Sequence, residues 1–422
     1  MLDGQGIKVD YLARVEGQGA LDIAVNRDSV DVKLRIFEPP RFFEAFLAGR
    51  SYDEVHELTS RICGICPVAH QMTSLRAVEN ALGIDASRQT RDLRKLLALS
   101  AIMNSHVLSL LMLSAPDYFG QGGVFSLREK KPGLVKRALK LKKLANDIGD
   151  VVGGRAVHPV YAVVNGFTRV PSRPQIEGLR ARLRQATGEV AQTARLFGGL
   201  EHPAISGSEE QLAISHKDEY AVNEGVIRTT GGLSAPESKY RDIVSEEQIP
   251  YSYAKGSTLG GARTFLVGPL ARVNLNFGRL SDNARAIAGE MGFSPPRYSP
   301  FDSLFARALE VVHCVDESIG LMDGLPFVQE SPVHAFPRGG PRAGVALTEA
   351  PRGTLFHSFR FDRNGLVEYA DIVTPTDHNV KNIERDLKEL VGRYRDMPLD
   401  KLRLMCEMLV RAYDPCISCS VH

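Results

Sequence analysis

The sequence has little that would indicate a disulfide-bonded or nucleic-acid-binding protein. Six cysteines in 422 residues are far too few for a disulfide scaffold. The chain has 52 lysine and arginine residues against 50 aspartate and glutamate residues. The resulting net charge of +2 gives no reason to expect a nucleic acid or an anionic membrane as partner. There is also no internal repeat, low-complexity tract or long linker, so we expect an ordinary globular protein with a large core.

A signal peptide and a membrane span are also missing from the sequence pattern. The N-terminus, Met1 to Gly4, is polar and lacks the apolar stretch of a secretory signal. The most apolar stretch, Leu96 to Ala115, is interrupted by serine, asparagine and histidine side chains. A transmembrane helix needs about 20 nearly uninterrupted apolar residues. We therefore expect a helix buried within protein, no membrane span, and a cytoplasmic location.

Hydrophobic periodicity predicts a mainly helical, α+β fold with long buried helices and two small sheets. Period-two alternation around a polar turn at residues 26–28 predicts a hairpin over residues 20–36, and a second sheet is expected over residues 345–373. A loop rich in glycine and proline is expected at residues 337–344. Apolar residues at helical spacing predict helices at 51–61, 70–82, 91–113, 134–152, 173–200, 284–292, 301–323, 379–390 and 400–413. We expect residues 1–422 to form a single unit.

Four of the six cysteines form two Cys-x-x-Cys pairs at opposite ends of the chain. Cys63 and Cys66 lie near the N-terminus, and Cys416 and Cys419 lie near the C-terminus. Two such pairs supply four thiolates, a soft ligand set suited to zinc, iron or nickel. Their spacing does not choose among these metals, and a structural zinc site is the plainest alternative. A thioredoxin-like redox pair is less favoured, because neither pair lies in a βαβ pattern.

The surroundings of the pairs argue against structural zinc. Most of the chain separates the two pairs, whereas zinc modules usually close short loops. Joining them at one metal would make the whole chain one interlocked unit. A histidine also follows each pair, at His70 and His422. Polar groups beside a four-thiolate site suggest a tuned outer shell, which catalytic metals need more than structural ones.

Both pairs lie in longer motifs. Arg61 to His70 has the form Arg-x-Cys-Gly-x-Cys-x-x-x-His, and Asp414 to His422 has the form Asp-Pro-Cys-x-x-Cys-x-x-His. Together they resemble the paired signatures of nickel–iron hydrogenase large subunits. Further elements of that family match at residues 14–17, 40–44, 154–159, 349–353 and 373–376. The resemblance covers essentially the full chain and implies a catalytic subunit that cleaves H2 reversibly into protons and electrons.

Within that family the chain is most similar to cytosolic, multisubunit enzymes that couple H2 to NADP(H), the sulfhydrogenase group. The stretches Val410 to His422, Pro40 to Ala45 and Ser238 to Asp242 carry this similarity. The first motif departs from it. Cys63 to Cys66 reads Cys-Gly-Ile-Cys, which is the general family form, where these sulfhydrogenases carry Cys-Ser-Phe-Cys.

The resemblance implies a nickel ion bound by four thiolates, two of them shared with iron. Carried over by position, Cys63 and Cys416 would be terminal nickel ligands. Cys66 and Cys419 would bridge nickel to iron. The family's iron carries CO and two cyanides, which need a dry pocket with a few hydrogen-bond donors. The expected cofactor is therefore a Ni-Fe(CO)(CN)2 centre.

Other positions would shape that pocket. Arg352 and Thr376 match family positions that hold the cyanides, and Pro375 would help to wall the pocket. His70 would form a hydrogen bond with the sulfur of a bridging cysteine, which tunes its charge. Asp117 matches a family aspartate near the site.

The chemistry also needs a route for protons. H2 is apolar and a very weak acid, so a soft metal must polarise it while a nearby base takes the proton. Cys416 is the candidate first base, because a thiolate on nickel can accept a proton without leaving the metal. A carboxyl group must then carry the proton out of a buried site. Glu16 matches the family's proton-relay glutamate, although alone it would read as half of a surface ion pair.

A second metal site is implied beside the first. Glu44 and the C-terminal His422 match ligands of a magnesium-type site, and the backbone oxygen of Ile372 matches a third. A hard cation with carboxylate and water ligands could order the proton path. Histidine is an unusual magnesium ligand, so the expected ion is Mg²⁺ or a similar divalent cation.

Electrons need partners that this chain does not contain. Cys314 and Cys406 lie alone in apolar helical patterns, where core packing is the simplest reading, so no cysteine cluster remains for an iron–sulfur relay. No Gly-x-Gly-x-x-Gly follows a strand, so no nucleotide site is expected. The resemblance therefore implies an iron–sulfur small subunit and diaphorase subunits that carry flavin and NAD(P). It also implies nickel-insertion factors and a maturation protease, with a chain ending at His422 as the processed form.

Two other functions stay open at this point. A relative of this subunit in the quinone-reducing respiratory complex has lost the metal-binding cysteines and forms part of a quinone cavity; the intact pairs speak against that role. A structural zinc protein without catalysis is the second. Metal analysis separates all three, since only the hydrogenase is expected to hold nickel and iron.

Overall fold

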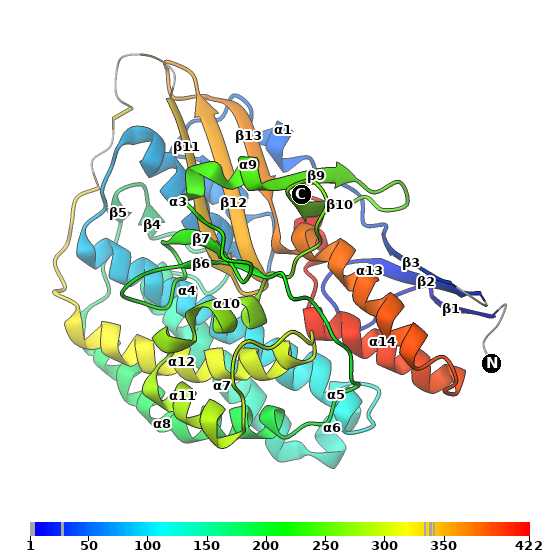
Figure 1. Ribbon diagram of the computed structural model, residues 1–422. Helices are drawn as coiled ribbons and strands as arrows, with labels where there is room; N and C mark the ends of the chain where they lie inside the picture. The colour runs from blue at the N-terminus through cyan, green and yellow to red at the C-terminus, as the bar shows by residue number, and fades with distance from the viewer. Residues whose placement is uncertain (1–4, 27–28, 333–334, 337–339, 341) are drawn as a thin grey trace.

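Helices make up most of the regular structure of the protein (Figure 1). The structure is a computed structural model that describes residues 5–26, 29–332, 335–336, 340 and 342–422. The predicted turn at 26–28 lies mostly outside these residues, and so do residues 337–339 and 341 of the predicted loop at 337–344. The end of that loop was predicted wrongly, because residues 342–344 already belong to a strand. The α-helices are α1 (Phe43–Leu47), α2 (Val55–Ser60), α3 (Pro67–Leu82), α4 (Arg88–Leu108), α5 (Ala115–Tyr118), α6 (Val124–Lys130), α7 (Pro132–Gly153), α8 (Arg173–Gly198), α9 (Tyr240–Ile243), α10 (Pro269–Asn276), α11 (Asp282–Glu290), α12 (Asp302–Gly324), α13 (Pro375–Arg393), α14 (Leu399–Tyr413) and α15 (Ile417–Ser420). The prediction of a mainly helical fold is confirmed.

The strands of the described residues form five small antiparallel sheets. Both predicted sheets are among them, with orders β1-β2-β3 and β11-β12-β13; the other three, β4-β5, β6-β7-β8 and β10-β9, were not predicted. Their strands are two to five residues long, too short for an alternating pattern to stand out. The strands are β1 (Gln5–Val9), β2 (Gly19–Val25), β3 (Val30–Ile36), β4 (Ala162–Val163), β5 (Gly166–Phe167), β6 (Leu212–Ser215), β7 (Val226–Thr229), β8 (Ser234–Ala235), β9 (Val244–Gln248), β10 (Lys255–Leu259), β11 (Arg342–Ala350), β12 (Gly353–Phe361) and β13 (Val367–Val373).

The long helices pack together below the largest sheet in the view of Figure 1. Helix α4 packs against α7 and α12, and α12 packs against α8. The predicted helix at 91–113 is interrupted, because α4 ends at Leu108 and continues as a π-helical segment, Ser109–Ser114, before α5. The combined run, Arg88–Tyr118, is long and apolar enough to cross a membrane, but 78% of its most apolar window is buried inside the protein. Core helices pass the same test of length and composition.

Local sequence signals fix the ends of two helices that border the cysteines. Gly83 adopts a left-handed conformation with φ 68° and ends α3, as the sequence predicts. Pro67 takes the first position of the same helix, where its missing N–H removes no hydrogen bond. Thr374 forms a capping box at the start of α13 with Asp377.

The two ends of the chain lie side by side. An isolated bridge pairs Glu16 with Cys416, and the N–H of Ile417 donates to the backbone oxygen of Glu16 at 3.0 Å. Helix α3 packs against β11 and β12, and α13 packs against β3. In Figure 1 the red C-terminal segment accordingly lies next to the blue N-terminal strands. The main hydrophobic core includes residues from Ile7 to Val421.

Candidate metal centre

The first cysteine pair lies in the loop between α2 and α3. Cys66 is the N-cap residue of α3, and both cysteines are buried. The backbone N–H groups of Ile65 and Cys66 point to the sulfur of Cys63, at 3.3 and 3.5 Å. This loop therefore supplies hydrogen-bond donors that favour a thiolate at Cys63.

The second pair follows α14 through a tight turn. Asp414 ends that helix with φ 55°, a conformation that turns the chain inward. The Arg352 guanidinium donates to the backbone oxygen of Asp414 at 2.7 Å and to its carboxylate at 3.1 Å. Arg307 donates to the backbone oxygens of Ala412 and Tyr413 at 2.7 and 3.0 Å. Two buried arginines thus hold the segment that presents the second cysteine pair.

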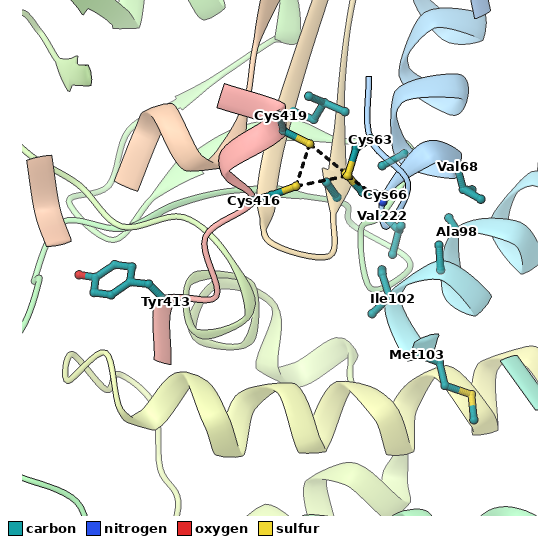
Figure 2. Close-up of a cluster of buried hydrophobic side chains, with 14 of the residues drawn as sticks. Cys63, Cys66, Val68, Ala98, Ile102, Met103, Val222, Tyr413, Cys416 and Cys419 are labelled. Atoms are coloured by element: carbon teal, nitrogen blue, oxygen red, sulfur yellow. Dashed lines mark hydrogen bonds between the residues drawn. The ribbon is translucent and has the colours of Figure 1, made fainter. Parts of the chain in front are cut away.

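The four sulfurs meet in one buried cluster (Figure 2). Cys63 and Cys416 lie 3.3 Å apart, Cys66 and Cys419 3.2 Å, and Cys416 and Cys419 2.9 Å, measured between Sγ atoms. All four Sγ atoms lie within 4.8 Å of one another, and none forms a disulfide. Zinc–sulfur bonds of about 2.3 Å imply tetrahedral sulfurs roughly 3.8 Å apart, so the cluster has the size of a metal site.

The charge of this cluster favours a metal as well. Burial raises the pKa of the Cys416 and Cys419 thiols well above the usual value. The pKa of Cys63 is lowered instead, because hydrogen bonds from Cys416, Cys419 and Cys66 stabilise its thiolate. The protein alone therefore does not favour ionisation of all four thiols. All four can ionise together when a metal cation neutralises them, and metal binding then releases their protons.

Arg352 and Thr376 both face the second cysteine motif. The hydroxyl of Thr376 accepts the backbone N–H of Cys416 at 2.9 Å, and Pro375 is the buried first residue of α13. Nη1 of Arg352 is buried and, within the described part of the chain, has no hydrogen-bond partner. Burial alone would lower the pKa of Arg352, but Asp414 and the nearby cysteine sulfurs raise it well above its usual value. A charged donor with an unused N–H is what a small polar ligand on a metal would need.

Glu16 is brought directly against the second motif. Its carboxylate accepts the backbone N–H of Ser418 at 3.0 Å and the hydroxyl of the same serine. Ser418, which lies between the two C-terminal cysteines, was not predicted as a site residue. A signal was available, because the resemblance placed Glu16 near this motif and Ser418 is its only hydroxyl residue before Cys419.

Glu44, Ile372 and His422 also come together. The backbone N–H of Ile372 donates to Glu44 at 2.8 Å, and Nε2 of His422 lies 3.7 Å from the same carboxylate. In an antiparallel strand the N–H and C=O of one residue point to the same side, so the oxygen of Ile372 faces the side of Glu44. Burial would raise the pKa of Glu44, but His422 and the Ile372 N–H together lower it.

Asp117 forms ion pairs with two segments that border the site. Its carboxylate pairs with Arg14, two residues before Glu16, and with Arg411 of α14 at 2.7 Å. It is therefore a link between the N-terminal loop and the helix that leads to the second cysteine pair.

His70 lies beside the sulfurs. Its Nε2 is 3.6 Å from Sγ of Cys419, and its Nδ1 is 3.1 Å from Nε2 of His357. Burial lowers the pKa of His70 to about 3. The sequence reasoning did not identify His357, because the residue lies on a strand nearly 300 positions away and no spacing connects it with the cysteines.

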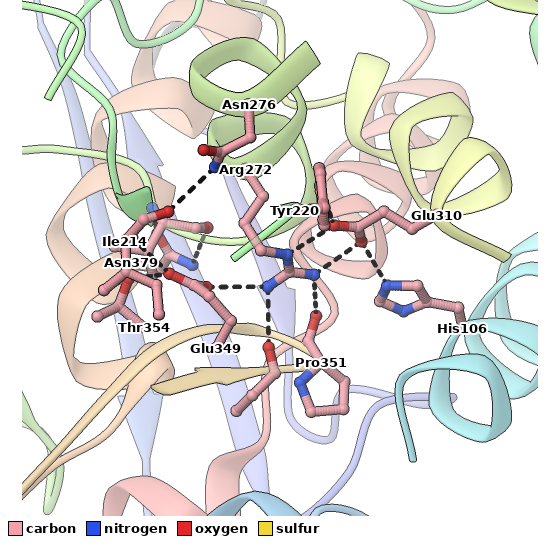
Figure 3. Close-up of polar contacts among 12 residues, drawn as sticks. His106, Ile214, Tyr220, Arg272, Asn276, Glu310, Glu349, Pro351, Thr354 and Asn379 are labelled. Carbon is pink, nitrogen blue, oxygen red and sulfur yellow. Dashed lines mark hydrogen bonds and ion pairs between the residues drawn. The ribbon is translucent and has the colours of Figure 1, made fainter. Parts of the chain in front are cut away.

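A second polar cluster was also missed and contacts the backbone just before Arg352 (Figure 3). The Arg272 guanidinium binds both carboxylate oxygens of Glu310, at 2.6 and 2.7 Å, and one oxygen of Glu349 at 3.1 Å. It also donates to the backbone oxygens of Ala350 and Pro351, at 2.8 and 3.0 Å. This buried network therefore holds the backbone that precedes Arg352.

The two remaining cysteines, Cys314 and Cys406, are buried in α12 and α14. Burial raises the pKa of Cys406 to about 12, so its thiol stays neutral. Among the described residues, the four-cysteine cluster is the one group of histidine, cysteine and acidic side chains with the geometry of a metal site.

The sequence is similar to those of known proteins over nearly its full length. A family model described as "Nickel-dependent hydrogenase" matches residues 41–131 and 215–422. Sulfhydrogenase 1 subunit alpha of Pyrococcus furiosus is 36% identical over 99% of this chain and 97% of that protein. Sulfhydrogenase 2 subunit alpha of the same organism is 32% identical over 99% of this chain and 98% of that protein.

Solved structures share the fold. A crystal structure of an NAD⁺-reducing [NiFe]-hydrogenase in the H2-reduced state matches with a TM-score of 0.85 and 24% identity, covering 99% of both chains. The Ni-Fe-Se hydrogenase of Desulfovibrio vulgaris Hildenborough matches with a TM-score of 0.81 and 22% identity, over 99% of this chain and 100% of that one.

Proposed function

The chain belongs to the nickel-dependent hydrogenase family, and from this membership we infer that it is the catalytic subunit of a nickel–iron hydrogenase, which oxidises or produces H2. The observation that carries this function is the meeting of four buried sulfurs, two from each end of the chain. The donor set fits a nickel–iron centre, because four soft thiolates suit nickel and can share sulfurs with iron. We propose that residues 1–422 form the single unit that this centre closes.

Each cysteine is given a role in this proposal. Cys63 and Cys416 would be terminal nickel ligands, and Cys66 and Cys419 would bridge nickel to iron. The short separations of the Cys66–Cys419 and Cys416–Cys419 sulfurs, 3.2 and 2.9 Å, are compatible with this sharing. When bound, the centre would supply a soft electrophile that polarises H2.

The pocket would be completed by CO and two cyanides on iron. Arg352 supports this proposal with a buried, charged Nη1 that has no partner within the described residues. Thr376 would offer its hydroxyl hydrogen, since its oxygen already accepts the N–H of Cys416. Pro375, which has no N–H, would present an apolar wall.

Protons would leave through Cys416 and Glu16. Sγ of Cys416 would accept the proton from H2, and the carboxylate of Glu16 would take it up and pass it outward. The hydroxyl of Ser418 would guide this transfer, because it donates to Glu16 from the same motif. The proximity of Glu16 to the backbone of Cys416 supports the route.

A divalent cation, Mg²⁺ or similar, is proposed beside Glu44, His422 and the backbone oxygen of Ile372. The carboxylate and the carbonyl are the hard oxygen ligands that such a cation prefers. The contacts among the three residues support this placement. The ion would order water along the proton route.

Partner subunits would carry the electrons. An iron–sulfur small subunit is proposed, with flavin and NAD(P) in diaphorase subunits and NADP(H) or NAD(H) as the acceptor. The similarity to sulfhydrogenase alpha subunits and to the fold of an NAD⁺-reducing hydrogenase supports these partners. We also propose a cytoplasmic location and maturation by nickel-insertion factors and a protease.

Metal analysis of the purified protein tests the central proposal. We expect nickel and iron in about equal amounts. Zinc alone, or no metal, would refute the proposed nickel–iron centre. Glu16→Gln tests the proton route, because glutamine keeps the shape but cannot carry the proton. The variant should retain both metals and lose at least ~100-fold of H2/D⁺ exchange. Full exchange activity would remove Glu16 from the route.

A further inference from the structure

A continuous chain of hydrogen bonds leads from the sulfur cluster into the protein. It begins at Cys419 and runs through His70, His357 and Ser74 to Thr59. The separations are 3.6 Å from Sγ of Cys419 to His70, 3.1 Å between the imidazoles, 2.8 Å from His357 to Ser74, and 2.7 Å between the hydroxyls. All five side chains are buried, with at most 1% of each exposed.

The fold places these groups so that both nitrogens of His357 are used. His70 and Ser74 are four residues apart on α3 and therefore lie on the same face of the helix. His357 lies on β12, which packs against that helix, and its ring bridges the two side chains. Thr59 on α2 is the last residue of this series of hydrogen bonds.

The direction of one hydrogen bond fixes the direction of all the others. Both imidazoles are fully buried, and burial favours the neutral ring, which donates at one nitrogen and accepts at the other. If His70 donates from Nε2 to Cys419, its Nδ1 must accept from Nε2 of His357. Nδ1 of His357 must then accept from the hydroxyl of Ser74.

A metal-bound thiolate settles which direction holds. Such a sulfur has no proton to donate, so the facing Nε2 of His70 must carry one. The hydroxyl of Thr59 then donates to Ser74 at 2.7 Å. In the reverse direction Thr59 would donate to the backbone oxygen of Val55, 2.9 Å away, and a bare nitrogen of His70 would face a negative sulfur.

We propose that His357 and Ser74 are positioning residues, which hold His70 in the tautomer that donates from Nε2 to the sulfur of Cys419. The proposal rests on the nickel–iron centre inferred above and adds two residues that do not touch it. A hydrogen bond to a thiolate ligand withdraws charge from the metal and favours its reduced state. Loss of the bond therefore shifts the metal's potential to more negative values.

The tautomers are measured directly by two-bond ¹⁵N–¹H correlation spectra of the holoenzyme, labelled with ¹⁵N-histidine and held in a diamagnetic state. Single variants at His70 and His357 assign the two rings. We expect the proton on Nε2 in both. A proton on Nδ1 of His357 would overturn the proposal.

Ser74→Ala tests the positioning role through the nickel potential, followed by electron paramagnetic resonance during a redox titration. The variant removes the donor to His357, so we expect mixed tautomers and a more negative potential. Thr73→Val is the matched control, because this neighbouring residue of α3 loses a buried hydroxyl that bonds Thr348 at 2.5 Å, outside the chain to His70. Equal potentials in the wild type and Ser74→Ala would contradict the proposal.

Thr59→Val separates positioning from general disturbance. The variant leaves the hydroxyl of Ser74 free to donate to His357, so both tautomers and the potential should stay as in the wild type. A shift as large as that of Ser74→Ala would oppose the stated direction. Metal analysis distinguishes the two levels of failure. Wild-type protein without nickel and iron refutes the proposed function, whereas a metallated Ser74→Ala variant with unchanged spectra refutes this inference alone.

Discussion

Two buried polar clusters lie near the segment that carries Arg352, and they are stabilised in opposite ways. In the cluster around Arg272, every carboxylate oxygen of Glu310 and Glu349 has a donor from the protein (Figure 3). In the sulfur cluster, four cysteine side chains face one another (Figure 2). The first cluster contains its own cation, the Arg272 guanidinium, whereas the four sulfurs are arranged to bind a metal cation.

This difference distinguishes a polar cluster that stabilises the fold from one that holds a metal. A buried ion pair whose partners are all protein groups is fixed when the chain folds, and removing one partner leaves an uncompensated charge. A thiolate cluster depends on its metal, so its integrity is read from bound nickel and iron. Substitutions in the Arg272 cluster should therefore lower the melting temperature first, and substitutions in the sulfur cluster should lower the metal content first.

Cys419→Ser should have the largest effect. The hydroxyl of serine is a hard, weakly acidic ligand that replaces a soft thiolate between nickel and iron. We expect loss of the bimetallic centre and of all H2/D⁺ exchange, with the chain still folded. Elemental analysis and circular dichroism measure the two properties together. A normally metallated variant would disprove the bridging role of Cys419.

Arg272→Met should affect stability first. The substitution removes the cation between two buried carboxylates, and breaking a buried ion pair in this way typically costs about 3–5 kcal/mol. The melting temperature should fall strongly, and loss of nickel should follow unfolding. Arg195→Met is the control, since its pair with Glu290 is exposed and surface pairs contribute little. Equal melting temperatures for the two variants would erase the contrast between buried and surface pairs.

The two clusters also differ in how far the sequence could reveal them. The Cys-x-x-Cys pairs can be recognised in the sequence, because the spacing within each pair is a local pattern with a chemical reason. Arg272 and Glu310 come from α10 and α12 and share no motif, so only the packing of these helices brings them together. His357 was missed for the same reason, because it lies on β12 and only packing brings it to the helix that carries His70.

The long helices were predictable because apolar spacing over five or six turns is a strong signal. Two helix ends differ from the prediction, for different reasons. The helix expected at 91–113 gives way to a π-helical segment at Ser109, and α13 begins at Pro375 because Thr374 caps it. Short sheets such as β4-β5 form only where neighbouring segments align them, so single-strand patterns could not predict them.

The Arg272 cluster should also produce a pH dependence that the sulfur cluster does not explain. His106 lies 2.7 Å from Glu310, and burial lowers its pKa to about 4 despite that carboxylate. Histidine in the unfolded chain titrates near 6.5. As the pH falls from about 6.5 to 4, the unfolded chain binds a proton that the folded chain does not, so the free energy of unfolding decreases.

His106→Gln tests this dependence, because glutamine keeps a donor for Glu310 but does not titrate. The melting temperature of the variant should fall less between pH 7 and pH 5 than that of the wild type. Comparing the two slopes cancels the contribution of the metal centre, which both proteins contain. Parallel slopes would contradict this prediction, because they would mean that His106 binds its proton over the same pH range in the folded and the unfolded chain.

Cys406→Ala should have the smallest effect and completes the comparison among cysteines. This thiol is buried in α14, a few residues before the second motif, and burial raises its pKa to about 12. A neutral thiol packs as an apolar group, so its loss should cost about 1 kcal/mol through a small cavity and leave nickel and iron content unchanged. Elemental analysis and a thermal melt beside Cys419→Ser measure both values. A loss of nickel from Cys406→Ala would mean that proximity to the motif, and not sulfur ligation, governs metal retention in this part of the chain.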